Sequence, residues 1–184
     1  MAEMIEDILS ISLSVMFFSA VALIGYSYAV YPMILPLLAR GKKLSEERFE
    51  DDDEYPEIGV LMAVYNEEAV LEKTLRSILE SDYPAGKVRV WIGSDASTDG
   101  SHRIIERFQG QYPELRLKIF PGRNGKIKII NQLAIDARTA MENPESAGLV
   151  LCDANVAWSK QALRNMIRHF KRDEVGLVGS SVMD

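Results

Sequence analysis

The sequence predicts an α/β fold in which a mostly parallel sheet carries helices on both faces and an N-terminal transmembrane helix precedes it. Beyond residue 56, apolar strand-like runs alternate with segments of helical periodicity, and repeated β-α units of this size form parallel sheets with right-handed crossovers. Nearer the N-terminus, residues 8–39 contain no Asp, Glu, Lys, Arg or His, which is typical of a membrane span.

The bulk composition narrows the class of protein. With 184 residues the chain has room for one domain and an appendage, and it is too short for two α/β domains. Its net charge of −6 opposes a general attraction to nucleic acid, so an anionic ligand would need a metal ion or a few local cations. Cys152 is the single cysteine, which excludes an intramolecular disulfide and fits a reducing compartment.

Residues 8–30 form the most apolar segment and are long enough to cross a hydrocarbon core of about 30 Å as a helix. A cleavable signal peptide would begin with basic residues and have a shorter apolar core, whereas Glu3, Glu6 and Asp7 precede this run. A buried helix of a globular protein is rarely so long. We therefore expect a membrane span.

The charges that flank the span predict its orientation. Acidic residues precede it and basic residues follow it, so the positive-inside tendency places the C-terminal side in the cytoplasm. We expect the membrane to be the inner membrane of a bacterium. The basic residues are Arg40, Lys42 and Lys43. Pro32 and Pro36 predict a kinked or interrupted end to the span, or a segment along the membrane surface.

Three parts follow from this pattern. A membrane anchor is expected over residues 1–44, an acidic linker over 45–55, and the α/β part over 56–184. Acidic residues dominate 46–54, with Arg48 and Phe49 as exceptions, and charge blocks of this kind rarely pack against a core. We therefore expect the linker to be solvated.

Five apolar runs predict the strands of the sheet. The first is an uninterrupted apolar stretch typical of a buried strand, and the third alternates in polarity. The strands are expected at 58–64, 88–92, 115–120, 149–152 and 175–182.

Four segments with apolar residues at helical spacing predict the intervening helices. They are expected at 68–81, 100–109, 126–140 and 160–170. The inward faces of the first three should carry Leu71, Leu75, Ile78 and Leu79, then Ile104, Ile105 and Phe108, then Ile130, Leu133, Ala134 and Ala137.

Polar residues follow three of the predicted strands directly, at 63–67, 94–100 and 153–155. The carboxyl ends of parallel strands share one edge of the sheet, and ligands bind in the crevice beyond that edge. We therefore expect these stretches to converge on one binding site, although they lie far apart in the sequence.

Each stretch also has a structural interpretation. Ser97, Thr98 and Asp99 precede a helix and are suited to capping its free N–H groups, which we favour for Asp99. Asp95 comes too early to cap that helix and lies at the sheet edge. A carboxylate there can accept a hydrogen bond from a nucleobase N–H or a ribose hydroxyl, so we favour a functional role for Asp95.

For the stretch after the first strand, the sequence does not decide between a structural and a ligand-binding role. Asn66 is suited to the N-cap of the following helix, and Glu67 and Glu68 can complement the helix dipole. Tyr65 either stacks on a base or belongs to the core.

The segment 123–126 lies between a strand and a helix, where backbone N–H groups and the helix dipole favour an anion. Arg123 and Lys126 add positive charge, although a glycine turn with solvated basic residues explains the same pattern. It is not a phosphate loop ending in Gly-Lys-Ser/Thr, because Ile127 follows Lys126.

Asp153 and Asn155 follow the fourth strand and offer the oxygen ligands that Mg²⁺ and Mn²⁺ prefer. A short acidic motif is weak evidence by itself, and its position at the shared edge strengthens it. Cys152 fits a small core residue, and His102 and His169 lack ligand spacing, so we expect both to be structural or at the surface.

Together these motifs resemble the family 2 glycosyltransferases, enzymes of the GT-A fold that use nucleotide-sugar donors. The matching positions are 64–67, 95–101, Gly125 and Lys126 with Asn131, and 153–155. The leading span, with Tyr31 and Pro32, is similar to that of the membrane-bound, processive-type members. The resemblance covers residues 56–184.

The resemblance implies a role for each matched residue. Val64, Tyr65, Glu67 and Asp95 would hold the base and ribose. Arg123 and Lys126 would lie near the nucleotide or its diphosphate. Asp153 would be the first acid of an Asp-x-Asp element that binds the donor and its divalent metal, Mg²⁺ or Mn²⁺, with Asn155 at the second position. The donor would be a UDP-sugar, and the acceptor a glycan or lipid at the cytoplasmic membrane face.

The chain also departs from the family pattern. Asn155 stands where an acid is usual, Ala96 where Gly is usual, and Ser94 where a first Asp is usual. The acceptor half of the family, with its acidic base and Gln-x-x-Arg-Trp element, is not present in residues 1–184. We therefore expect the donor-binding half of a transferase. The alternative is a truncated, non-catalytic nucleotide-binding or membrane scaffold protein.

Overall fold

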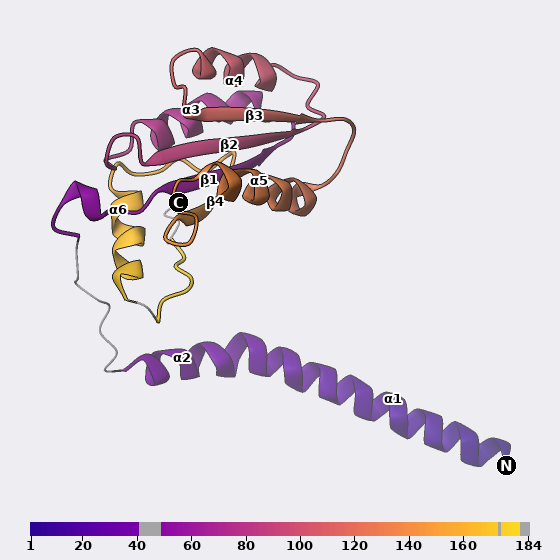
Figure 1. Ribbon diagram of the computed structural model, residues 1–184. Coiled ribbons are helices and arrows are strands. Elements are labelled where there is room, and N and C mark those ends of the chain that lie inside the picture. The colour runs from indigo at the N-terminus through magenta and orange to yellow at the C-terminus, as the bar shows by residue number, and fades with distance from the viewer. Residues whose placement is uncertain (41–48, 173, 181–184) are drawn as a thin grey trace. The chain divides into compact units, whose positions relative to one another are not determined.

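The computed structural model describes residues 1–40, 49–172 and 174–180, and the chain divides into two compact units (Figure 1). The first unit is Met1–Ser45 and the second is Glu46–Asp184. This boundary lies at the start of the acidic segment that the sequence predicts to be a linker.

The first unit is helical over nearly all of its described length. It consists of α1 (Ala2–Gly25), a π-helical turn η1 (Tyr26–Val30) and α2 (Tyr31–Ala39). The helical segment Met4–Ala39 has 36 residues and contains an 18-residue stretch with a mean hydropathy of 2.3, so it is long and apolar enough to cross a membrane. It is therefore a candidate membrane span. Lys42 and Lys43, which contribute to the predicted orientation, lie outside the described residues.

The interruption expected near the prolines is a wide turn rather than a break. The backbone N–H of Tyr31 donates to the carbonyl of Tyr26, five residues earlier. Pro32 follows and has no N–H to donate, so a π turn just before it accommodates the missing bond. The chain stays helical past Pro36 to Ala39.

The second unit contains a four-stranded parallel sheet in the order β3-β2-β1-β4 (Figure 1). Its strands are β1 (Ile58–Val64), β2 (Val88–Asp95), β3 (Leu115–Phe120) and β4 (Gly148–Asp153). In the register, Val64 lies opposite Ser94, Ala63 opposite Asp153, and Asp95 opposite Phe120. The strands therefore end at nearly the same level, as the sequence predicts.

Helices cover both faces of this sheet. Residues of α3 (Glu68–Leu79), α4 (Ser101–Gln109) and α6 (Ala162–Ile167) join one core cluster, together with alternate residues of β1 and β2. On the other face, α5 (Lys126–Ala140) packs on Leu61 and Trp91. Alternate strand residues point to opposite faces, which explains why neighbouring positions feed two separate clusters. The predicted fold class is confirmed.

Several details of the helices and the last strand differ from the prediction. In α5, Leu133 and Ala137 are buried as predicted, but the third buried residue is Ile129, while Ile130 and Ala134 are half-buried. The helix expected over 160–170 is α6 followed by a 3-10 turn, η3 (Arg168–Lys171). The strand expected at 175–182 is wrong for 175–180, which form no strand, and residues 181 and 182 lie outside the described part. An apolar run becomes a strand only where another strand pairs with its backbone.

In the described part of the acidic segment, residues 50–54 are exposed as expected, but the segment is also attached to the domain. The Tyr55 ring is buried, with ring centroids 4.7 Å from Phe49 and 5.2 Å from Tyr83. The Lys87 ammonium donates to three backbone carbonyls within 52–55, at 2.7–3.0 Å. Acidic side chains stay in water here while their backbone is held by a cation.

We expect Lys87→Met to lower the free energy of unfolding of the second unit by about 2 kcal/mol, because three carbonyls lose a charged donor. Tryptophan fluorescence of the full chain in detergent measures this unit alone, since both tryptophans, Trp91 and Trp158, belong to it.

Lys73→Met on the exposed face of α3 is the matched control for this change. It should alter the unfolding midpoint little. Equal destabilisation by the two variants would contradict the structural role assigned to Lys87.

Candidate functional site

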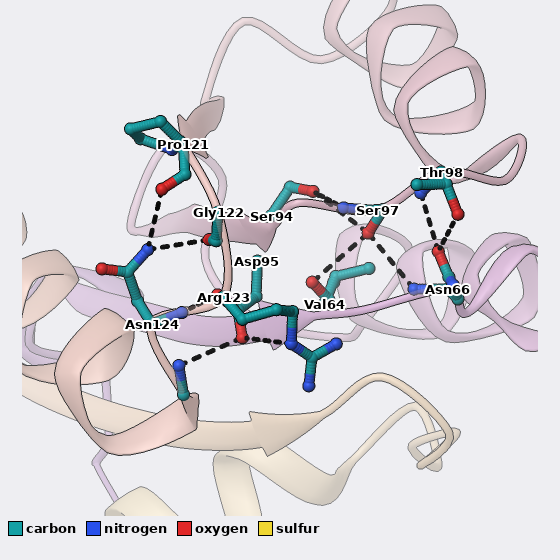
Figure 2. Close-up of polar contacts among 11 residues, drawn as sticks. Val64, Asn66, Ser94, Asp95, Ser97, Thr98, Pro121, Gly122, Arg123 and Asn124 are labelled. Atoms are coloured by element: carbon teal, nitrogen blue, oxygen red, sulfur yellow. Dashed lines mark hydrogen bonds and ion pairs between the residues drawn. The ribbon is translucent and has the colours of Figure 1, made fainter.

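The loops that follow β1 and β2 are joined by hydrogen bonds (Figure 2). Asn66 has a positive φ of 54°; its N–H donates to Ser97 Oγ at 3.2 Å, and its Oδ1 accepts from the Thr98 N–H at 2.8 Å. Ser97 Oγ also lies 3.5 Å from the Val64 carbonyl. The cap roles considered for Asn66, Ser97 and Thr98 are wrong, because these residues link the two loops instead.

Asp99 does satisfy helix N-termini, as the sequence predicts. Its carboxylate accepts from the N–H of Glu68 at 2.9 Å and of Ser101 at 3.0 Å, which are the first residues of α3 and α4. Burial by itself raises the pKa of this carboxyl, but the hydrogen bonds outweigh it and the pKa of Asp99 is lowered. One side chain thus fixes the start of two helices.

Asp95, the last residue of β2, holds the loop that follows β3. Its Oδ1 accepts from the Asn124 N–H at 2.6 Å and its Oδ2 from the Gly125 N–H at 3.1 Å (Figure 2). The Arg123 Nε lies 3.4 Å from Oδ2. The backbone hydrogen bond from Asn124, with those from Gly125 and the charge of Arg123, lowers the pKa of Asp95. The carboxylate is therefore ionised and almost fully buried.

The Arg123 side chain also covers the Tyr65 ring. Its guanidinium carbon lies 3.2 Å from the ring centroid, and Tyr65 is 43% exposed. Of the two alternatives for Tyr65, the core position is wrong, because the ring is exposed and lies against Arg123. An accessible aromatic face next to a cation can stack a planar ligand.

Ser94 and His102 form a pair that sequence reasoning did not find. The Ser94 Oγ is buried and lies 2.6 Å from His102 Nε2 and 3.1 Å from Ser97 Oγ. His102 is thus structural, as expected. Spacing gave no signal for this contact, since the two residues belong to a strand and to the helix that follows the intervening loop.

The other acid at the sheet edge is Asp153, the last residue of β4. Its Oδ1 accepts a hydrogen bond from the Lys126 ammonium at the start of α5. Both side chains are more than half exposed, at 56% and 59%. The next residue, Ala154, is buried, and its carbonyl accepts from Thr74 Oγ1 at 2.7 Å. The backbone under Asp153 is therefore fixed while its carboxylate faces solvent.

Asp153, at the end of β4, and Asn155, just after it, fit a divalent cation that keeps part of its water shell. Asp153 and Asn155 both supply oxygen atoms and are both exposed. Within the described residues, no three His, Cys, Asp or Glu side chains cluster as a ready-made metal centre. Mg²⁺ fits such a pair, because it retains several waters and binds one or two carboxylates together with substrate phosphates.

The predicted convergence of distant acids at one edge is confirmed. In the sheet, β1 separates β2 from β4. Two consecutive residues at the start of α5 contact both β2 and β4: the Gly125 N–H donates to Asp95 and the Lys126 ammonium to Asp153. Glu67 is less well placed. Its N–H donates to Ser101 Oγ at 3.0 Å, and none of the described contacts joins its carboxylate to the other predicted site residues.

Comparison with known families identifies the α/β part. A family model described as "Glycosyl transferase family 2" matches residues 59–184. A beta-monoglucosyldiacylglycerol synthase of Synechocystis sp. is 31% identical over 124 residues, which cover 66% of this chain and 24% of that protein. The glycosyltransferase AglE of Haloferax volcanii is 27% identical over 127 residues, covering 69% of this chain and 40% of its own length. The chain thus spans a quarter to two fifths of these relatives.

Two solved structures share this architecture over part of their length. The mannosyltransferase PcManGT of Pyrobaculum calidifontis, in complex with GDP-Man and Mn²⁺, has a TM-score of 0.64 and 27% identity, over 85% of this chain and 44% of that one. TarS residues 1–349 of S. aureus, in complex with UDP-GlcNAc, has a TM-score of 0.50 over 59% of this chain and 29% of that one. At 21% identity the latter shows the fold alone.

Ala96, in the loop after β2, has a φ of 57°, a conformation that favours glycine. We expect Ala96→Gly to raise the free energy of unfolding by roughly 0.5–1 kcal/mol, because the relieved strain exceeds the added chain entropy of glycine. Tryptophan fluorescence during denaturation measures the change. Ala69→Gly, at an exposed helical position of α3, should instead lower stability by a similar amount. A loss of stability in both variants would show that Ala96 is not strained.

Proposed function

The chain belongs to glycosyl transferase family 2, and we propose that its α/β part binds a nucleotide-sugar donor, a UDP-sugar, at the carboxyl edge of the sheet. The observation that carries this proposal is the placement of Asp95 and Asp153 along one edge, with a single basic loop between them. We propose that the complete enzyme transfers the sugar to a glycan or lipid acceptor at a membrane.

The base and ribose would lie over the loop that follows β1. The Tyr65 ring offers a stacking face, and Arg123, which lies on that ring, also pairs with Asp95 at the end of the neighbouring strand. Val64 and Glu67 flank this position in the sequence, but the Val64 side chain is fully buried in the core, so only its backbone could meet a nucleotide. Arg123, which now lies on the Tyr65 ring, would move aside or cover the opposite face of the base.

The diphosphate would lie against the start of α5. Lys126 is the first residue of this helix, and Arg123 lies three residues before it. A protein with a net charge of −6 needs such local cations to hold an anion. The backbone N–H groups of the first helical turn add to the same attraction.

Asp153 and Asn155 are the residues that would hold Mg²⁺ or Mn²⁺. When bound, the cation would neutralise the charge of the departing diphosphate. Arg123 and Lys126 supply part of that neutralisation from the chain itself. The sugar would be displaced directly at its anomeric carbon, with the acceptor approaching from the side opposite the diphosphate.

The first unit would anchor this site to the membrane. The described residues of Met4–Ala39 expose a continuous apolar surface that is far larger than the apolar patches usual on soluble proteins. We propose residues 1–44 as the anchor, 45–55 as the connection and 56–184 as the donor-binding part, with the C-terminal side of the span in the cytoplasm of a bacterium. Arg40, directly after the span, supports this orientation.

Titration of the full chain in detergent with UDP in the presence of Mn²⁺ tests the donor site. We expect saturable heat of binding, weaker for GDP than for UDP. The absence of binding heat with both UDP and GDP would contradict the proposal. Release of UDP from UDP-sugars in the presence of membrane lipids separates a transferase from the non-catalytic alternative, which would bind nucleotide without turnover.

Replacement of two nearby acids distinguishes a nucleotide contact from a helix cap. We expect Asp95→Asn to weaken UDP binding roughly ten-fold or more, because a charge-assisted hydrogen bond and the position of Arg123 are both lost. Asp99→Asn should leave UDP affinity nearly unchanged and lower the free energy of unfolding by about 1 kcal/mol. Equal effects of the two changes on UDP affinity would remove the distinction.

The charge of Asp95 also predicts a pH dependence. The pKa of its carboxyl is lowered in the folded protein, so its contribution to stability is complete above the unfolded pKa of about 3.9. This contribution to stability should be lost as the pH falls through the lower pKa that Asp95 has in the folded protein. Acid unfolding of Asp95→Asn, followed by tryptophan fluorescence, should lack this component and begin from a lower stability at neutral pH. An unchanged acid profile would contradict it.

A further inference from the structure

Two basic side chains near the start of α5 form ion pairs with the two acids of the proposed site. The Arg123 Nε approaches Asp95 Oδ2 at 3.4 Å, and the Lys126 ammonium donates to Asp153 Oδ1. In this arrangement the cations that would meet a diphosphate are already paired with carboxylates.

The two pairs differ in how easily they can exchange partners. The Asp95 side chain is 6% exposed and is also bound to the backbone of Asn124 and Gly125, so its place is fixed. Lys126 and Asp153 are both open to water, and exposed ion pairs of this kind contribute little free energy. The Lys126 ammonium can therefore exchange Asp153 for another anion that binds nearby.

A divalent cation and the Lys126 ammonium compete for the same carboxylate. Like charges at about 4–5 Å repel each other appreciably even in water. Asn155, the only other side-chain ligand we assign to the site, carries no charge to offset that repulsion. Cation binding to Asp153 thus requires that Lys126 move away.

We propose, on the basis of the proposed function, that the Lys126 ammonium stays bound to the Asp153 carboxylate and blocks cation binding there until a nucleotide diphosphate binds the ammonium instead. The diphosphate gives the ammonium a new partner and leaves the carboxylate free for Mg²⁺ or Mn²⁺. Nucleotide and cation therefore bind with positive coupling, and each raises the affinity of the other by the same factor. Lys126 is a positioning residue that makes cation binding depend on the donor.

The test is Mn²⁺ binding to the full chain in detergent, without nucleotide, measured by the electron paramagnetic resonance signal of free Mn²⁺. Lys126→Gln should raise the Mn²⁺ affinity on the order of ten-fold. Lys128→Gln is the matched control: it removes the same charge two residues further along α5, where the ammonium donates to Asn124 Oδ1 at 2.9 Å and not to a carboxylate. It should change the affinity by no more than about two-fold.

Repeating the titration with saturating UDP measures the coupling. UDP should raise the Mn²⁺ affinity of the unmodified chain by a larger factor than that of Lys126→Gln, because the variant has no ammonium to displace. Asp153→Asn should reduce Mn²⁺ binding in both conditions. Full retention of Mn²⁺ affinity in Asp153→Asn would place the cation elsewhere and overturn the inference.

Equal changes in Lys126→Gln and Lys128→Gln, or a lower Mn²⁺ affinity in Lys126→Gln, would also overturn it. Absence of Mn²⁺ binding in all variants would do the same. A UDP titration without metal reports on the proposed function separately. If UDP binds while Lys126→Gln leaves Mn²⁺ affinity unchanged, the inference fails and the donor site stands. If UDP never binds, the proposed function fails, and the nucleotide-free Mn²⁺ titrations still decide the competition.

Discussion

The site depends on the hydrogen bonds that the buried Asp95 carboxylate accepts from the loop after β3. An ionised carboxylate inside a protein must find donors, and the backbone N–H groups of Asn124 and Gly125 supply them. Gly125, at a φ of 83°, lets the chain turn there into α5. One buried charge therefore determines where α5 begins, and with it the positions of Arg123 and Lys126.

Parallel pairing does the rest of the assembly. The register brings the last residues of β1, β2 and β4 to a common edge, so acids that lie far apart in the sequence reach one loop. An acidic protein gathers positive charge at this edge by placing two cations a few residues apart in the sequence. Their pairing with Asp95 and Asp153 keeps the edge locally neutral. Both cations at this edge are therefore paired with carboxylates of the chain itself.

The opposite end of the sheet is held by a different interaction. Lys87 binds the backbone carbonyls of residues 52–55, and Arg164 pairs with Asp52 at 2.9 Å. The acidic segment therefore joins the domain before β1 begins.

The sequence by itself determined the fold class, the bounds of β1, β3 and α5, the apolar N-terminal helix and the residues that meet at the sheet edge. The spacing of apolar residues predicts the helices and strands, because it depends only on neighbouring positions in the sequence. The rule that parallel strands end at one shared edge predicts which polar stretches meet. Only the tertiary structure decided that Asp95 binds a loop, that Asn66 links two loops and that Phe49 packs. Each of these depends on which donor or ring a side chain meets across a long sequence separation, and no spacing rule encodes that. The same limit explains the missing strand at 175–180, since a strand needs a partner as well as a suitable sequence.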